Sequence, residues 1–547
     1  MPEKKAGLLA RMFPRYALNR YANQMRLEHM KREYEAVKKT RRRRQRLDMR
    51  SADQINSVSV DKMRATARYL DENHDLARSV LNTSVSQVVG GGLVTFPMPK
   101  RPDGTVNIEL ADRLTILWND WSKRPEVTHS ICWAKVQQLA WRSMFRDGEI
   151  FIQRLPGRIP GLRHGSEVAY SLEPLEADFI PVEFNDPAQG IRQGVKKNAW
   201  GRPVAYYAYK HYPTEGPGDI AISSLLSLSS GVRLADVKKV DADRIIHLAH
   251  LDRFRQTRGM SALASVITRL DDLKDYEESE RMAARMGAAF AIAINKSVDT
   301  HTGVESGTSF REMNIAPGMI FEGMPGETVS TVKTERPDNK LGEFRRDMLR
   351  AVAGGTDTAH SSISKDFDGS YSSRRQELVE QGRTNTMLRG HFVDVVVQPI
   401  YQDFINVAAL QGLIDVRNAD PLSLYDADHV GMGTAYIEPM KEVQADLISI
   451  QAGIQSLTGV QLARALNPRE VHKQLVRERE LQQQDGLVLL SDHANSLKMT
   501  ENAGPDEEDE TDDDGRAYVI GRTYQGDDGN TYKFTSSGFQ LIAERTG

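Results

Sequence analysis

The segment at residues 366–376, DFDGSYSSRRQ, brings an aromatic ring, two carboxylates, a run of hydroxyls and two guanidinium groups into one short stretch. Ser373 stands three residues before Gln376, which is the spacing of a capping box, so we predict that a long helix begins there. Arg374 and Arg375 would then lie in its first turn, where cations oppose the helix macrodipole. This placement indicates either an anion nearby or simple solvation of both side chains, and the sequence leaves the two readings open.

Motifs that mark common enzymes do not occur in this sequence. It contains no G-x-x-x-x-G-K-[ST] phosphate loop, no Cys/His cluster with zinc spacing and no G-x-S-x-G nucleophile elbow. Acidic pairs such as Asp271 with Asp272 do not lie in the apolar pattern that would tune an acid and a base. His247 and His250 are three apart in a strand-like segment and point to opposite faces, which argues against a shared metal. We therefore expect no cofactor, no metal site and no enzymatic activity.

Composition is that of a soluble protein with several packed units. The chain has 547 residues, of which 39% are hydrophobic and 27% charged, and length alone predicts two to four units. No apolar run approaches the roughly 20 residues that a membrane span requires, so we expect no membrane partner. The single cysteine, Cys132, excludes an internal disulfide and is expected to pack in the core.

Charge is unevenly distributed along the chain, although the net charge is only −3. Residues 31–50 are strongly basic, whereas residues 505–514, PDEEDETDDD, are almost wholly acidic and predict a disordered linker. The near-neutral net charge argues against a protein that binds nucleic acid over its whole surface. Tight static binding neutralises many phosphates and therefore needs an excess of positive side chains.

Hydrophobic periodicity predicts an α+β protein that is mainly helical. The segment that starts ICWAKVQQLAWRSMFRD at residue 131 should form a helix that buries a stripe of apolar residues, and short β-rich runs follow between 150 and 255. A helix over 259–287 has one apolar face and one acidic face, DDLKDYEESE. The helix that follows the opening segment contains Pro399, so a kink is expected near Gln398. The predicted stripe of the helix from residue 131 consists of Trp133, Val136, Leu139, Ala140 and Met144.

The arrangement resembles the lambda-type portal proteins of tailed bacteriophages over roughly residues 55–485. No single motif that carries the resemblance is a catalytic signature, but eight occur in the right order. They are DENHDLARSVLNTSVSQVVGGG, RSMFRDGEIFI, GRPVAYYAY, HLAHLDRFRQTRGMSAL, LDDLKDYEESERMAAR, SKDFDGSYSSRRQELVE, QPIYQDFI and YIEPMKEVQADLISIQAGIQS. The basic N-terminus and the acidic tail are less typical of that family.

The resemblance implies the portal fold, with wing, stem, clip and crown, assembled as a ring. It implies a homododecamer at one capsid vertex that conducts double-stranded DNA during packaging and ejection and nucleates procapsid assembly. The implied partners are the terminase large subunit, the head-completion or tail adaptor protein, the major capsid protein and the scaffold. The protein would act in the host cytoplasm during assembly and then in the virion.

Family architecture assigns the segments in chain order. The expected divisions are a basic helical arm (1–50), the wing (51–258), stem helix 1 (259–289), the clip (290–337), stem helix 2 (338–353), a tunnel loop (354–372), a kinked helix with the wing return (373–434), crown helices (435–490), an acidic linker (491–515) and a small β-rich appendix (516–547).

The resemblance also implies three sets of site residues. The DNA-channel set is Ser361, Ser362, Ser364, Lys365, Asp366, Phe367, Asp368, Gly369, Ser370, Tyr371, Arg374 and Arg375. The set that lines the stem lumen or pairs subunits is Asp271, Asp272, Lys274, Asp275, Glu277 and Glu278. The clip set, which would dock terminase and adaptor, is Phe310, Arg311, Glu312, Phe321, Glu322, Glu327 and Lys333.

Two alternatives remain open at this point. A nuclease-like enzyme of the packaging machinery requires a carboxylate cluster that the sequence does not reveal. A scaffold or shell protein would form closed shells or lattices in place of rings.

Overall fold

A computed structural model describes residues 50–210, 236–289, 293–296, 327–330, 341–431, 433, 439–485, 523–525, 531–535 and 538–543. The chain divides into two units, Met1–Gly431 and Met432–Gly547. The basic arm, the acidic linker and six of the seven predicted clip residues lie outside the described residues, and the seventh, Glu327, is described in its backbone alone.

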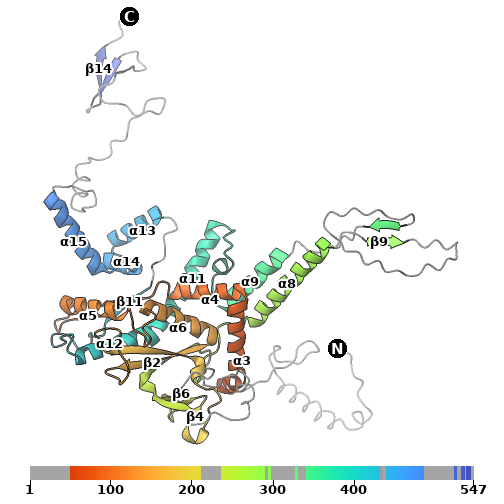
Figure 1. Cartoon of the computed structure of the whole chain (residues 1–547). Helices are drawn as coiled ribbons and strands as arrows, with labels where there is room; N and C mark the ends of the chain where they lie inside the picture. Colours follow the sequence, from red (N-terminus) through yellow and green to blue (C-terminus); the bar gives the residue numbers. More distant parts are fainter. Residues whose placement is uncertain are drawn as a thin grey trace, which may run out of the picture. The chain divides into compact units, whose positions relative to one another are not determined.

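Four helices near the start of the described chain supply much of the core of the first unit, together with residues from a sheet and from later helices (Figure 1). They are α3 (Ala52–Asn73), α4 (Asp75–Val88), α5 (Ile108–Trp121) and α6 (Trp133–Asp147). Ser51 and Gln54 form a capping box that begins α3, and Gly148 ends α6 in the left-handed conformation at φ 95°. Trp118, Trp121 and Trp133 pack edge to face or tilted at the centre of this core.

The predicted β-rich region folds as two antiparallel sheets. In the first, β2 (Glu149–Pro156) lies between β3 (Tyr170–Glu176) and β8 (Ile245–Ala249). The second has the order β4 (Ile191–Arg192), β5 (Val195–Lys197), β6 (Pro203–Tyr209) and β7 (Val237–Asp241). Short 3₁₀ turns occur at Ala177–Phe179, Pro187–Gln189 and Ala242–Arg244. A separate pair joins β1 (Val94–Pro97) to β11 (Ala427–Val430).

Two long helices lie side by side (Figure 1). They are α8 (Ile267–Ala289) and α9 (Leu341–Gly355), and Tyr276 of α8 contacts Phe344 of α9 with ring centroids 4.6 Å apart. The predicted apolar face of Leu263, Ile267, Leu270 and Leu273 is buried, as expected. In the part of the chain that connects α8 to α9, β9 (Ala293–Lys296) pairs with β10 (Glu327–Ser330).

The chain then passes through a short helix into a long, interrupted one. After α10 (His360–Ser364), α11 (Tyr371–Phe392) continues through a π-helical turn, Val393–Val397, into α12 (Gln398–Leu410). Pro399 has no backbone N–H to donate, and the interruption lies in the turn just before it, so the irregularity predicted near Gln398 is confirmed.

The second unit contains helices and a small sheet. The helices are α13 (Pro439–Gln451), α14 (Leu457–Ala463) and α15 (Pro468–Asp485). Near the C-terminus, β12 (Thr523–Gln525), β13 (Thr531–Thr535) and β14 (Gly538–Ala543) form an antiparallel sheet, so the predicted hairpin has a third strand.

Three predictions about individual elements were wrong. The helix predicted from residue 259 begins only at Ile267, because Met260 and Ala262 donate backbone hydrogen bonds to His250 and Phe145 and hold that stretch against α6 and β8. Leu139 is not in the buried stripe of α6 but is 39% exposed. Cys132, expected in the core, is exposed at the position that precedes α6.

Candidate functional site

The first half of the predicted tunnel loop is fastened to the body of the protein. Ser79 of α4 donates a hydrogen bond to the carbonyl of Ile363 at 2.8 Å, and Gln87 donates to the hydroxyl of Ser362 at 3.2 Å. The backbone N–H of Ser361 donates to Glu377, and Ile363 itself is buried in the core. Residues 356–364 are therefore not a free loop, because hydrogen bonds hold this segment against α4.

The second half of that segment is exposed. Phe367 is 58% exposed, and Lys365, Asp368, Gly369 and Ser370 are also exposed. Asp366 is half-buried and lies 3.6 Å from Arg346 of α9, and its side chain accepts from the backbone N–H of Asp368. The segment that can meet a partner is thus residues 365–370 together with the start of α11.

The start of α11 lies three residues before the predicted one, a difference of nearly one turn. The N-cap is Ser370, whose side chain accepts from the N–H of Ser373, and the helix begins at Tyr371. Arg374 and Arg375 are consequently the fourth and fifth helical residues, beyond the free N–H groups of the first turn. Their position no longer requires an anion at the helix end. Arg374 is half-buried and Arg375 exposed.

The predicted stem residues divide between the two faces of α8. Asp272, Asp275 and Glu278 are exposed, and Asp271 is half-exposed. Glu277 instead faces α9, where Arg345 lies 3.3 Å from its carboxylate. Lys274 lies over the ring of Tyr69 at 4.9 Å and donates to its hydroxyl at 3.3 Å. Among the predicted stem residues, only Asp271, Asp272, Asp275 and Glu278 are therefore available to line a lumen or to pair with another subunit.

A buried charge cluster that the sequence analysis missed joins α3, β2 and β8 to the segment that leads into α8. Glu149, at the start of β2, is wholly buried and receives a hydrogen bond from Arg258 at 2.7 Å and from the N–H of Gly259 at 2.9 Å. Arg64 of α3 and His247 of β8 lie 3.3 and 2.9 Å from the same carboxylate. Arg258 also donates to the carbonyls of Ala177, Ile180 and Gln193, which satisfies its buried guanidinium.

The electrostatics of this cluster keep Glu149 ionised. Burial alone would raise the pKa of Glu149, but the charge of Arg258 and the hydrogen bond from His247 outweigh it and lower that pKa well below its usual range. Asp147, two residues earlier, behaves alike: burial raises its pKa, and Arg146 with Arg68 lowers it by a larger amount. The signal in the sequence was a glutamate directly before the apolar run Ile150–Ile152.

Backbones meet closely at the same joint. A Cβ on Gly259 would lie 1.9 Å from the carbonyl oxygen of Gly148, and a Cβ on Gly148 would lie 2.6 Å from the carbonyl carbon of Met260. Only glycine fits at either position, so the entry to α8 is held directly against the end of α6.

Within the described residues no group of three or more His, Cys, Asp or Glu side chains is arranged to hold a metal ion. In the same part of the chain, none of the helices has the length and apolarity needed to cross a bilayer. His247 and His250 have separate partners, Glu149 and the carbonyl of Met260.

Comparison with known proteins decides the family. The sequence model described as "Phage portal protein, lambda family" matches residues 38–389. The chain belongs to the lambda family of phage portal proteins. It is therefore a structural protein of the virion, the portal of a phage-like particle, and the resemblance seen in the eight motifs is confirmed.

Individual relatives agree with this assignment. The "Probable portal protein" of Halomonas phage phiHAP-1 is 18% identical over 480 residues, which are 84% of this chain and 88% of the relative. "Portal protein B" of Escherichia phage lambda is 21% identical over 253 residues, 41% of this chain and 48% of the relative.

Among solved structures, a chain of the "Virion of native gene transfer agent (GTA) particle" matches with a TM-score of 0.42 and 14% identity, covering 76% of this chain and 94% of that one. A chain of the "Neck of native GTA particle computed with C12 symmetry" has a TM-score of 0.39 over the same shares.

Proposed function

We propose that this portal protein assembles as a dodecameric ring at one capsid vertex and conducts double-stranded DNA during packaging and ejection. It takes part in procapsid assembly in the host cytoplasm, together with the major capsid protein and scaffold. The ring docks the terminase large subunit during packaging and the head-completion or tail adaptor protein afterwards, through the clip between α8 and α9. Membership of the portal family supports this proposal.

One observation carries the ring. The described residues of α13, α14 and α15 include none that is buried, although the three helices and the turns between them present many apolar side chains. Helices of this length are marginal in water unless an apolar face is packed. Other copies of the chain would cover these residues. The exposed set is Met440, Val443, Leu447, Ile448, Ile454, Leu457, Leu466, Leu475, Val476 and Leu481.

We assign the DNA contact to the exposed end of the tunnel segment. Lys365, Arg374 and Arg375 supply the cations there, and Ser370 supplies a hydroxyl close to them. The hydroxyls of Ser362 and Ser364 have the different role of holding the segment on α4 and within α10, and Ser361 is tied to Glu377 through its backbone N–H. Only a few cations suit a conduit, because each phosphate contact adds affinity and DNA must slide.

The acidic residues on the outer face of α8 fit the same constraint. Asp272, Asp275 and Glu278 would repel phosphate if they line the tunnel and so keep DNA from binding to the wall. The alternative is that they form salt bridges with the neighbouring subunit. Both roles are compatible with a ring.

The experiment replaces the three cations together, as Lys365→Ala, Arg374→Ala and Arg375→Ala. We expect rings of normal size in negative-stain images and a several-fold fall in the DNA retained per particle, measured by quantitative PCR after nuclease treatment. The matched control replaces three exposed cations away from the segment, Lys62, Arg101 and Arg202, and should package normally. Normal packaging by the first variant would remove these three residues from the mechanism.

A further inference from the structure

Phe367 is poorly suited to contact DNA, although it lies in the exposed part of the tunnel segment. Its neighbours on both sides are aspartates, and two carboxylates beside the ring repel phosphate. A phenylalanine ring that is 58% exposed nevertheless gains free energy when it is covered. The triplet Asp366–Phe367–Asp368 therefore fits a partner with an apolar pocket and a positive rim.

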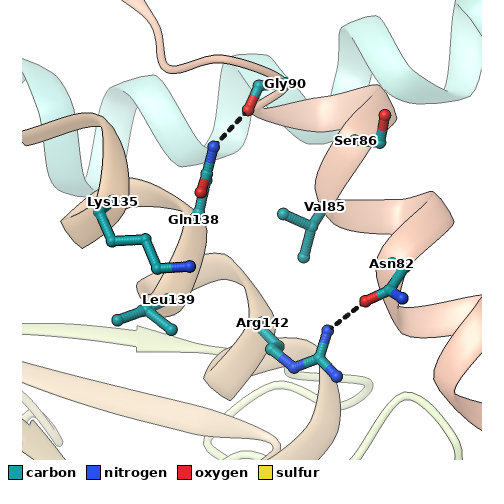
Figure 2. Close-up of a pocket in the computed structure, with 8 residues that line it drawn as sticks. All are labelled: Asn82, Val85, Ser86, Gly90, Lys135, Gln138, Leu139 and Arg142. Carbon is teal, nitrogen blue, oxygen red and sulfur yellow. Dashed lines mark hydrogen bonds between the residues drawn. The ribbon is translucent and has the colours of Figure 1, made fainter.

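The same chain carries a pocket that combines apolar contacts with positive charge: among the eight residues that line it, Val85 and Leu139 are apolar and Lys135 and Arg142 are basic. A cavity of about 340 Å³ lies between α4 and α6, and Figure 2 shows Val85 of α4 pointing across it toward Leu139 and Lys135 of α6. Roughly 150 Å³ suffices for a benzene ring in a protein interior, so the volume accommodates a phenylalanine side chain. Leu139 is the apolar residue of α6 that the core does not use.

The rim of the cavity is cationic and firmly held. Arg142 donates to Asn82 at 2.7 Å and also contacts Asp71, while Gln138 donates to the carbonyl of Gly90 at 2.7 Å (Figure 2). Lys135 is exposed and makes no ion pair within the described part of the chain. Its charge is thus available to an incoming carboxylate.

The triplet Asp366–Phe367–Asp368 follows a helix, α10, that packs on one flank of α4, and the cavity lies on another flank of α4. Ser79, Thr83 and Gln87 of α4 hold α10, which precedes the triplet. Asn82, Val85 and Ser86 of the same helix line the cavity. At about 100° per residue the two sets face directions roughly 100° apart. Each copy therefore presents the triplet and the cavity on two different surfaces. Head-to-tail association in a ring requires two such different surfaces on each subunit.

We propose that Phe367 of one subunit inserts into the cavity between α4 and α6 of the next subunit, with Asp368 facing the neighbour's Lys135. This contact rests on the proposed ring. It goes further by naming what the tunnel segment binds, which is a second copy of this chain. The segment is then fixed at its tip, so that its three cations are held at a defined height in the tunnel.

Disulfide cross-linking tests the contact in the full-length protein. The native Cys132 is first replaced by serine, and Phe367→Cys and Leu139→Cys are then introduced together. After mild oxidation of assembled rings, a non-reducing gel should show a ladder of covalent multimers. A control that pairs Phe367→Cys with Ile116→Cys, exposed on α5, should remain monomeric.

The outcomes separate this contact from the ring itself. Wild-type protein that forms no rings contradicts the proposed function, whereas rings without a ladder overturn only the contact. A fast-migrating monomer band, which indicates a disulfide within one chain, overturns it as well.

Charge reversal gives a second test that needs no cysteine. Lys135→Glu and Asp368→Lys should each lower the fraction of protein in rings several-fold by mass photometry, and the double variant should restore it. Equal ring fractions in all four proteins would contradict the proposal.

Discussion

At the scale of single residues, the buried cluster around Glu149 sets the position of the segment that leads into α8. Four groups converge on one carboxylate: two guanidinium groups, one imidazole and one backbone N–H. A buried ion pair contributes little net stability compared with apolar packing, but removal of one partner leaves uncompensated charges. The function we assign to this cluster is therefore geometric: it fixes where the chain leaves β8 and the end of α6 toward α8.

Glu149→Gln tests this role. The substitution leaves Arg258 and Arg64 buried without their shared anion, so we expect a loss of about 3–5 kcal/mol in the free energy of unfolding, measured by urea denaturation. Glu72→Gln changes an exposed glutamate on α3 and should lie within about 0.5 kcal/mol of the wild type. Equal stability of both variants would show that the cluster does not hold the joint.

Residue roles were predictable only where the pattern was local. The apolar face of Leu263, Ile267 and Leu270 could be read from helical spacing, and it is buried. The cluster could not be read in this way, because Arg64, Glu149 and Arg258 are far apart in the chain. Cys132 and Leu139 were misplaced because a periodic stripe does not reveal where the neighbouring helix ends.

At the scale of elements, β11 is joined to the body through a half-buried histidine. His429 lies between the hydroxyl of Thr95 on β1, at 3.0 Å, and the amide oxygen of Gln398 on α12, at 2.7 Å. Burial lowers the pKa of His429 from 6.5 to about 4. Neutral imidazole satisfies both contacts, because one ring nitrogen accepts from Thr95 while the other donates to Gln398.

Stability should therefore fall as the pH drops from 6.5 to 4. In that window the unfolded chain binds a proton at His429 and the folded chain does not, so protonation favours unfolding. The full effect corresponds to about 3 kcal/mol. We expect His429→Gln to flatten the slope of the melting temperature against pH over this range.

His391→Gln, which changes an exposed histidine on α11, should keep the slope of the wild type. An unchanged slope in the His429 variant would contradict the assignment. Glu149 contributes mainly below its unfolded pKa of 4.5, at the acidic end of this window, and its contribution is the same in the wild type and in both histidine variants, so the difference in slope reports on His429.

The boundaries of helices depended on competition between alternative caps and between alternative backbone hydrogen bonds, which the sequence alone does not resolve. Ser370 and Ser373 are both good caps, and Ser370 begins α11 because its side chain accepts from the backbone of Ser373. The stretch at 259–266 has helical periodicity, but its backbone groups bond to α6 and β8 instead. The interruption before Pro399 was predictable, since it follows from proline chemistry.

At the scale of the whole molecule, one chain leaves much apolar surface uncovered. The helices α13–α15 bury none of their described residues, and α11 exposes Leu378, Val379 and Met387. Patterning within a sequence distinguishes core from surface but not solvent from a neighbouring subunit. The ordered series of motifs supplied that information, because it pointed to a family before any contact was known.

The most direct measurement is negative-stain microscopy and mass photometry of the purified full-length protein. The account predicts rings with a central hole and a mass near twelve times 61.3 kDa. Protein that remains monomeric under every assembly condition, or that forms closed shells or lattices, would contradict it.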